Sequence, residues 1–140
     1  PKGWENYGGA WKKADGEAVF RKTVDIPKNW AGRDLELSLG CLDDFDDTYF
    51  NGELIGRIDK TTPDFYSHKR VYVIPGKLVK AGKNVIAVRI FDHFGGGGFF
   101  AKPSEMFIRI KPKNQRAGWY HADYRDDFNF GDEPYRYKRW

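Results

Sequence analysis

Residues 35–57 constrain the fold of this chain more strongly than any other stretch. From residue 35 to residue 39 a leucine stands at every second position, which is the period of a strand that buries one face. Further along, Asn51 and Gly52 lie between two apolar pairs, and this dipeptide supplies the two positive φ angles of a type I′ turn. The stretch therefore predicts a strand and, after it, a tight β-hairpin.

The remaining apolar segments are also typical of β-structure. Short strands are expected at residues 19–26, 69–74 and 106–110. Residues 85–91 are nearly continuously apolar and β-branched, so we expect a central strand that is covered on both faces and is the most buried of all. No stretch of ten or more residues has a helical period. The pattern predicts an all-β fold, an antiparallel β-sandwich of short strands.

The chain divides into two consecutive segments that differ in composition. Residues 1–113 have the strand pattern, and 140 residues are enough for one such domain with its own core. Residues 114–140 carry many rings and charges with few aliphatic side chains, which favours a C-terminal arm or a linker to a missing domain over a ligand platform. The chain begins at Pro1 without a methionine, and we expect it to be part of a longer protein.

Charge and composition narrow the range of partners. The net charge of +4 is small beside 31% charged residues, and the basic residues are spread, so nucleic acid is not an expected partner, whereas a polyanionic ligand stays open. No apolar run has the length needed to cross a membrane. The single Cys41 excludes an internal disulfide and, beside a leucine strand, is expected to be a small buried apolar residue.

The connections between strands differ in character at the two ends of the predicted sandwich. Connections in an antiparallel sandwich alternate between the ends. The short, turn-like connections at residues 27–34, 51–52 and 75–83 fall at one end. The lead-in near Trp11 and the segments 43–47, 58–68 and 92–105 fall at the other end. Because binding residues gather on loops held by a rigid scaffold, we expect one ligand site at this second end.

An acidic segment is the first functional candidate at that end. Residues 43–47 hold four carboxylates in five positions, and stability alone gives little reason for such crowding. Carboxylates accept hydrogen bonds from sugar hydroxyls, and rings stack on sugar C–H faces. The candidate carbohydrate-binding residues are Trp11, Asp43, Asp44, Asp46, Tyr66, His68, Asp92, His93 and Phe99. Each has a structural alternative, since an Asp can cap backbone N–H groups and a ring can cover a core.

This hypothesis predicts how two substitutions behave. Asp44→Ala and Asp46→Ala are expected to weaken sugar binding while leaving the melting temperature nearly unchanged. A large thermal loss would identify the two aspartates as structural residues or metal ligands.

Metal binding and catalysis are the competing interpretations. Calcium could use Asp44, Asp46 and Asp47, although the segment lacks the glycine and distal Glu of an EF-hand, and no cofactor is required. Zinc is disfavoured because the three histidines are far apart in sequence. No nucleophile elbow, P-loop, dinucleotide fingerprint or HExxH motif occurs, and a small sandwich offers little room for a deep cleft. We therefore expect no independent catalysis, although a pair of carboxylates is invisible in sequence.

Residues 20–57, followed by residues 71–92 and a glycine run, resemble a known family. They resemble the galactose-binding-like jelly roll, the sugar-binding domain of glycoside hydrolase family 2 enzymes, and the similar domain of sialate O-acetylesterase-like proteins. The resemblance covers roughly residues 4–112 and is carried by the order of three short pieces. These are Asp43-Asp44-Phe45-Asp46, Asn51-Gly52 and Ala81-Gly82-Lys83-Asn84. The resemblance implies a β-sandwich jelly roll with an accessory role beside a catalytic domain.

The resemblance also implies a ligand role for Asp92 and the glycine loop, because the matching loop of family 2 enzymes can reach the neighbouring active site. The family often has an Arg directly after an aromatic residue in that loop. Here Phe99 and Phe100 lead to Ala101, and the nearest Arg is Arg109 in the next predicted strand.

We therefore expect a non-catalytic carbohydrate-binding accessory domain of a glycoside hydrolase or carbohydrate esterase. Its expected partners are an oligo- or polysaccharide and the neighbouring catalytic domain of the parent chain. As part of a bacterial polysaccharide-degrading protein it would be secreted or periplasmic. Two alternatives stay open: a domain that braces the catalytic partner without binding sugar, and a docking module for acidic or sulfated polysaccharide that uses Lys and Arg of residues 114–140.

Overall fold

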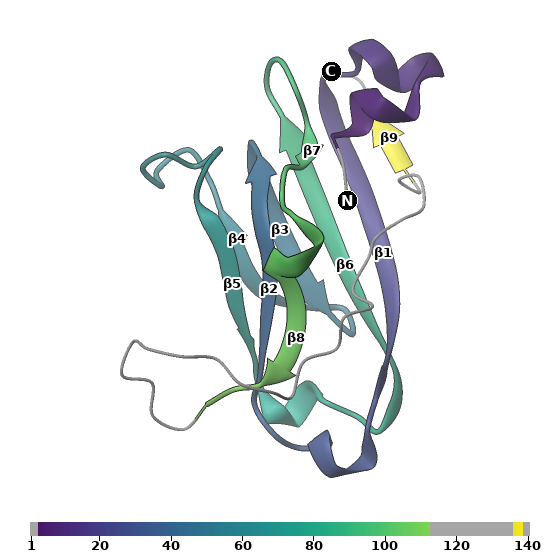
Figure 1. The fold of residues 1–140 in the computed structure, drawn as a ribbon, viewed down its shortest axis with the longest axis vertical. Coiled ribbons are helices and arrows are strands. Elements are labelled where there is room, and N and C mark those ends of the chain that lie inside the picture. The colour runs from purple at the N-terminus through teal and green to yellow at the C-terminus, as the bar shows by residue number, and fades with distance from the viewer. Residues whose placement is uncertain (1–2, 113–135, 139–140) are drawn as a thin grey trace.

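The computed structural model describes residues 3–112 and 136–138, and these residues form two antiparallel β-sheets packed against each other (Figure 1). The predicted all-β antiparallel sandwich is confirmed. Helical structure in the described residues is limited to 3-10 turns of three to five residues, and none of them has the length or apolarity to cross a membrane.

Each sheet is built from segments that are far apart along the chain. The five-stranded sheet has the order β4 (Glu53–Ile58), β3 (Phe45–Phe50), β6 (Gly82–Asp92), β1 (Gly16–Ile26) and β9 (Arg136–Lys138). The second sheet has the order β5 (Lys69–Ile74), β2 (Leu35–Asp43) and β7 (Gly98–Phe99), with β8 (Met106–Ile110) also paired to β2. The 3-10 turns are Trp4–Tyr7, Gly9–Lys13, Lys28–Trp30, Gly76–Leu78 and Pro103–Glu105.

The predicted hairpin is confirmed between β3 and β4. Asn51 and Gly52 have φ angles of 50° and 88°, the two positive values that the turn requires. The Asn51 side chain also donates to the Leu78 carbonyl (2.9 Å) and accepts from the Val85 N–H (2.9 Å). The hairpin is thereby tied to the start of β6.

The core follows the two-residue period of the facing strands. In β2, Leu35, Leu37 and Leu39 are fully buried, as their alternation predicted. The other sheet contributes every second residue of β6, including Ile86 and Ile90. Each such side chain adds about 2 kcal/mol to stability when it is removed from water. Cys41, expected to be buried, is half-buried instead, and its thiol donates to the Ser67 carbonyl.

The prediction that β6 is covered on both faces is wrong. The strand lies between β1 and β3, yet from residue 84 on its buried residues alternate with exposed or half-buried ones, and Val85 is 41% exposed. No described element covers the outer face of this part of the sheet. The most buried stretch belongs to β2, whose second edge is paired to β7 and β8.

The N-terminal lead-in is closed by the glycine loop. Trp4 is fully buried, and its indole N–H donates to the Ala14 carbonyl (2.9 Å). The Trp4 backbone N–H donates to the Gly97 carbonyl (2.9 Å), and a Cβ on Gly97 would lie 2.2 Å from the Trp4 ring. Glycine is therefore required at residue 97 by close packing, and Trp4 is a core residue.

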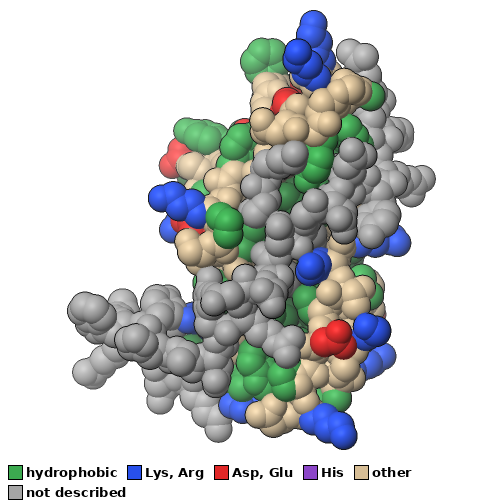
Figure 2. All heavy atoms as spheres, turned by 45° about the vertical axis from the view of Figure 1, so that its right-hand side comes forward, with side chains coloured by type: hydrophobic (Ala, Val, Ile, Leu, Met, Phe, Trp, Pro, Cys, Tyr) green, Lys and Arg blue, Asp and Glu red, His purple; other side chains and the backbone are tan. Residues whose placement is uncertain are grey.

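Of the predicted C-terminal arm, the described part is β9, which pairs with β1. Trp119, Tyr120, His121 and most other residues of 114–140 lie outside the described residues, so the division at residue 113 stays a prediction. On the face shown in Figure 2, the Lys and Arg side chains of the described surface lie in separate places.

Candidate functional site

Most of the longer connections meet at one end of the sandwich, as the alternation of strands predicted. Residues 100–105 are the exception, because they run along β2, where the Phe100 N–H donates to the Cys41 carbonyl and the Ser38 hydroxyl donates to the Glu105 carbonyl. The Asp44 N–H, between β2 and β3, donates to the Phe91 carbonyl at the end of β6 (3.2 Å). The lead-in is joined to the glycine loop through Trp4 and Gly97. In Figure 1 these connections and the β4–β5 loop lie in the upper part of the view, whereas the hairpin and the connections at 27–34 and 75–81 lie in the lower part.

The acidic segment is mostly strand, and Asp46 points into the protein. β3 begins at Phe45, directly after the cis peptide bond between Asp43 and Asp44. The Asp46 side chain is fully shielded from solvent, and its oxygens accept from Arg70 Nε (2.9 Å), the Tyr72 hydroxyl (2.9 Å) and the Thr48 hydroxyl (2.7 Å).

The Asp46 carboxylate does not face a ligand as predicted, because both of its oxygens are occupied inside the protein. Burial raises the pKa of Asp46, while the hydrogen bonds from Arg70, Thr48 and Tyr72 and the charge of Arg70 oppose that rise. Burial, followed by the charge of Asp46, also raises the pKa of the Tyr72 hydroxyl.

Arg70 organises this end of the sandwich and was missed in the sequence. Its guanidinium is fully buried and also donates to the carbonyls of Phe65 (2.6 Å), His68 (2.6 Å) and Asp44 (2.7 Å). It therefore holds the β4–β5 loop against the β2–β3 junction. The two-residue period of β5 could have indicated that Arg70 is buried, because residue 70 shares the inward face with residues 72 and 74.

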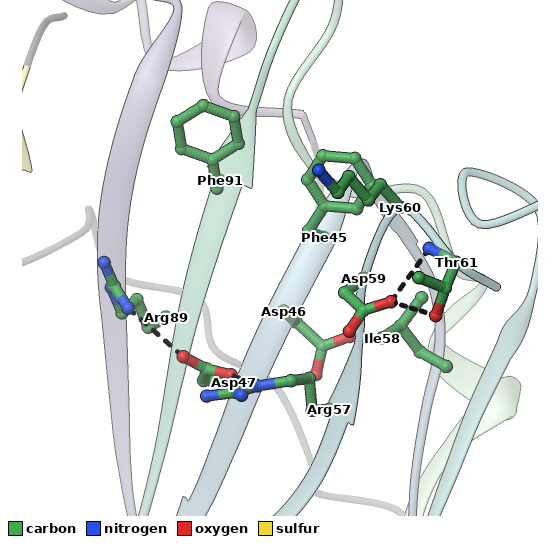
Figure 3. Close-up of a pocket in the computed structure, with 10 residues that line it drawn as sticks. All are labelled: Phe45, Asp46, Asp47, Arg57, Ile58, Asp59, Lys60, Thr61, Arg89 and Phe91. Atoms are coloured by element: carbon green, nitrogen blue, oxygen red, sulfur yellow. Dashed lines mark hydrogen bonds and ion pairs between the residues drawn. The ribbon is translucent and has the colours of Figure 1, made fainter.

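Asp47 lies on the outer face of the five-stranded sheet and is held by two arginines (Figure 3). Arg57 Nε donates to Asp47 Oδ1 (2.5 Å), and Arg89 Nη1 donates to Asp47 Oδ2 (3.2 Å). Arg89 also donates to Glu17 (2.5 Å), so the chain of ion pairs crosses β4, β3, β6 and β1. Arginines from neighbouring strands thus explain much of the acidic crowding that the sequence left unexplained.

A second acidic group holds the backbone of the loop after β6. Asp44 Oδ2 accepts from the His93 N–H (2.9 Å), and Asp92 Oδ1 accepts from the Phe94 N–H (3.1 Å). Asp92 is 1% exposed, and its Oδ2 has no hydrogen-bond partner among the described residues. The predicted ligand residues Asp44 and Asp92 therefore face inward, and Asp43 is the half-buried member of the group.

The proximity of these carboxyl groups changes their acidity. Burial, then the hydrogen bond and charge of Asp44, raise the pKa of Asp43 to about 7. Burial, then the charges of Asp44, Asp15 and Glu5, raise the pKa of Asp92 to about 6. Both groups change their charge near neutral pH.

Among the predicted rings, Phe99 belongs to the core. It is 2% exposed and lies edge-on to Phe20 with ring centroids 5.0 Å apart, so the expectation that it contacts a ligand is wrong. Trp11 is half-buried against Trp4, with centroids 6.2 Å apart. His68 is exposed.

Five rings form a continuous line across the upper edge of the outer sheet face, and we call this line the ring row. Its members, in order, are Tyr66, Phe65, Phe45, Phe91 and His93. Successive ring centroids lie 5.8, 4.7, 6.1 and 6.5 Å apart. The terminal Tyr66 and His93 are exposed, and the other three are half-buried. Phe45 and Phe91, which were not predicted as site residues, are cross-strand partners in β3 and β6.

A hollow of about 400 Å³ lies beside the ring row (Figure 3). Its lining comes from β3, β4, β6 and the start of the β4–β5 loop: Phe45, Asp46, Asp47, Arg57, Ile58, Asp59, Lys60, Thr61, Arg89 and Phe91. Asp59 Oδ1 accepts from the Thr61 N–H (2.9 Å) and the Thr61 hydroxyl (2.6 Å). The hollow combines an apolar ring wall with fixed polar groups, an arrangement suited to a polar molecule with C–H faces.

The calcium candidates Asp44, Asp46 and Asp47 do not form a joint site. Asp46 and Asp47 are each paired with arginine, and Asp44 accepts from the backbone of His93. Within the described ranges, no group of three or more His, Cys, Asp or Glu side chains is arranged to hold a metal ion.

Comparison with known proteins identifies similar folds. No protein-family model matches the chain, and no curated protein matches it in sequence. The β-glucuronidase of Ruminococcus gnavus is similar, with a TM-score of 0.57 and 16% identity over 68% of this chain and 16% of that chain. The β-D-glucuronidase of Dictyoglomus thermophilum has a TM-score of 0.58 and 18% identity over 85% of this chain and 20% of that chain.

A glycosyl hydrolase family 2 member from Bacteroides cellulosilyticus is also similar, with a TM-score of 0.57 and 18% identity over 71% of this chain and 15% of that chain. This chain therefore spans a fifth or less of the length of these three proteins. At such identities the likeness shows the fold: this chain is a β-sandwich similar to one part of glycoside hydrolase family 2 structures.

Proposed function

We propose that this chain is a non-catalytic accessory domain of a glycoside hydrolase and that it binds a saccharide along the ring row and in the adjacent hollow. The finer assignment, a galactose-binding-like jelly roll of a secreted or periplasmic protein, belongs to the same proposal, and a carbohydrate esterase as the parent enzyme stays an alternative. The similarity to a part of much longer glycoside hydrolases supports the accessory role.

The observation that carries the proposal is the ring row beside a polar hollow. Rings on a rigid sheet lose little conformational freedom when a ligand binds, and their faces attract the C–H faces of sugars. Phe45 and Phe91 are nearly parallel, with an interplanar angle of 12°, and both line the hollow. A sugar that stacks on these rings would reach hydrogen-bonding groups of the sheet, including Arg57 and Arg89.

The carboxylates support a non-catalytic role. Hydrolysis of a glycosidic bond uses two carboxyl groups that flank the bond. In the hollow, Asp46 is paired with Arg70, Asp47 is held by two arginines and Asp59 accepts from Thr61. None of these three is poised as a free acid or base.

A brace for the catalytic domain is the second candidate function, and one observation favours it. Phe94 is 84% exposed and Phe100 is 52% exposed, on either side of the glycine loop. Rings exposed to this extent suit a contact with another domain of the parent chain.

Titration of the chain with neutral and acidic oligosaccharides by calorimetry tests the proposal. Phe65→Ala and Tyr66→Ala shorten the ring row at a surface loop and are expected to weaken binding about tenfold. Phe94→Ala is the matched control, because it removes an exposed ring outside the row. Absence of binding to every saccharide would overturn the sugar-binding proposal and favour the brace.

A further inference from the structure

We propose that the hollow selects acidic sugars, with anionic groups of the sugar bound by Arg57 at one side of the hollow and by Lys60 at the other. This inference rests on the proposed saccharide binding and names the class of sugar. It uses residues of β4 and the loop after it, and no residue of 114–140.

The hollow contains hydrogen-bond donors that no described residue uses. Arg57 donates through Nε to Asp47, and its Nη1 and Nη2 groups make no hydrogen bond with a described residue. Its side chain is 55% exposed. Lys60 is exposed and forms no ion pair with any residue in the described ranges. Both cations line the hollow, so an incoming ligand meets unused N–H groups.

Most carboxylate oxygens of the hollow are already engaged, and Asp59 Oδ2 is the one that accepts no hydrogen bond from a described residue. Asp47 Oδ1 accepts from Arg57, and Asp47 Oδ2 accepts from Arg89. Asp59 Oδ1 accepts twice from Thr61, and these hydrogen bonds lower the pKa of Asp59. A neutral sugar presents hydroxyl donors as well as acceptors, and its donors would find few open acceptors here. An anionic group presents acceptors alone, which matches the unused donors.

The ion pairs also fix the direction of the Arg57 guanidinium. Because Asp47 accepts from Nε, the two Nη groups form the remaining edge of the guanidinium, and this edge makes no hydrogen bond with a described residue. A planar guanidinium edge of this kind binds a carboxylate or sulfate through two parallel hydrogen bonds. In Figure 3 the Lys60 ammonium is drawn beside the ring of Phe45, on the other side of the polar groups from Arg57.

The ring wall then orients the sugar. Phe45 and Phe91 line the hollow on the side opposite Arg57 (Figure 3). A sugar ring whose C–H face lies on these rings would direct a substituent of its other edge toward Arg57. The site would therefore recognise both an anionic substituent and the C–H face of the same sugar.

The test compares an oligogalacturonate with its methyl ester, because the two share the same sugar backbone and esterification removes the charge of the carboxyl groups. The wild-type chain is expected to bind the acid about tenfold more tightly than the ester, and this difference should shrink between about 50 mM and about 500 mM NaCl. A sulfated oligosaccharide, measured in parallel, distinguishes a preference for sulfate from one for carboxylate.

Two variants locate the preference. Arg57→Gln and Lys60→Gln are each expected to abolish most of the difference in affinity between acid and ester, and the acid-to-ester ratio is the quantity compared between variants. Arg21→Gln is the matched control, since Arg21 is an exposed arginine of β1 that does not line the hollow. Thermal melting of the wild type and the three variants checks that each variant is folded.

The outcomes separate this inference from the proposed function. Equal affinity for acid and ester, or a preference that survives both Arg57→Gln and Lys60→Gln, would overturn the selection of acidic sugars and leave saccharide binding intact. Binding of neither compound, nor of any neutral oligosaccharide, would overturn both.

Discussion

Arg70 and Asp46 form a buried ion pair that joins the two sheets, with 2.9 Å between Arg70 Nε and Asp46 Oδ1. Arg70 comes from β5 in one sheet and Asp46 from β3 in the other. Neither side chain is accessible to solvent. The pair therefore links the layers at the end where the loops meet, and it positions the backbone beside the ring row.

Removing one partner of this pair is expected to destabilise the fold. Asp46→Ala leaves the Arg70 charge buried without its carboxylate, which costs about 3–5 kcal/mol. The melting temperature should fall by more than about 10 °C. This reverses the sequence-based prediction that Asp46→Ala leaves the melting temperature unchanged. Asp25→Ala, at an exposed ion pair with Lys83, is the control and should have little effect.

The stability of the domain is expected to fall from about pH 5 to about pH 8. In the folded state the pKa of Asp43 is raised to about 7 and that of Asp92 to about 6. A carboxyl group with a raised pKa binds its proton more tightly in the folded state, so its contribution is present at low pH and is lost as pH rises through the folded pKa. Urea unfolding at the two pH values measures the difference.

Asp92→Asn should reduce this pH dependence and raise the stability at about pH 8, because the neutral amide carries no buried charge near Asp44. Asp25→Asn should leave the pH dependence unchanged, since Asp25 is exposed. A wild-type domain that is equally stable at both pH values would contradict the raised pKa values of Asp43 and Asp92.

Gly97→Ala is expected to weaken the packing of Trp4, in the N-terminal lead-in, against the glycine loop. The added Cβ would lie 2.2 Å from the Trp4 ring, so the ring or the loop must move, at a cost of about 1–3 kcal/mol. Gly96→Ala is the matched control, because its Cβ would meet the end of the exposed Phe100 ring at 3.2 Å and Glu5 Oε2 at 3.9 Å, without a severe clash. Tryptophan fluorescence and thermal melting report the change, and equal effects of the two substitutions would contradict the proposed packing.

Truncation of Phe99 should lower the stability of the domain strongly, whereas truncation of Phe94 should hardly change it. Phe99→Ala removes a buried ring that packs on Phe20 and should cost about 3–5 kcal/mol of stability. Phe94→Ala removes an exposed ring and should change stability by less than about 0.5 kcal/mol. Chemical denaturation of both variants decides whether Phe99 is a core residue, as its burial indicates.

Local patterns were sufficient for the strands and for the hairpin. The alternation from Leu35 to Leu39 and the Asn51-Gly52 turn depend on neighbours in sequence, so they could be read without coordinates. The same reasoning overestimated the burial of β6, because an apolar run does not reveal whether a second layer covers it.

By itself the sequence determined the class of fold, the hairpin and the end of the sandwich at which the elaborate loops meet, because strand periods, turn residues and strand alternation are local properties. Only the tertiary structure decided which aspartates face solvent. The arginines that hold Asp46 and Asp47 lie 24, 10 and 42 residues away in sequence, on strands whose pairing the sequence alone does not specify. The ring row likewise arises from side chains of two strands and a loop, so the candidate site exists only in the folded sheet.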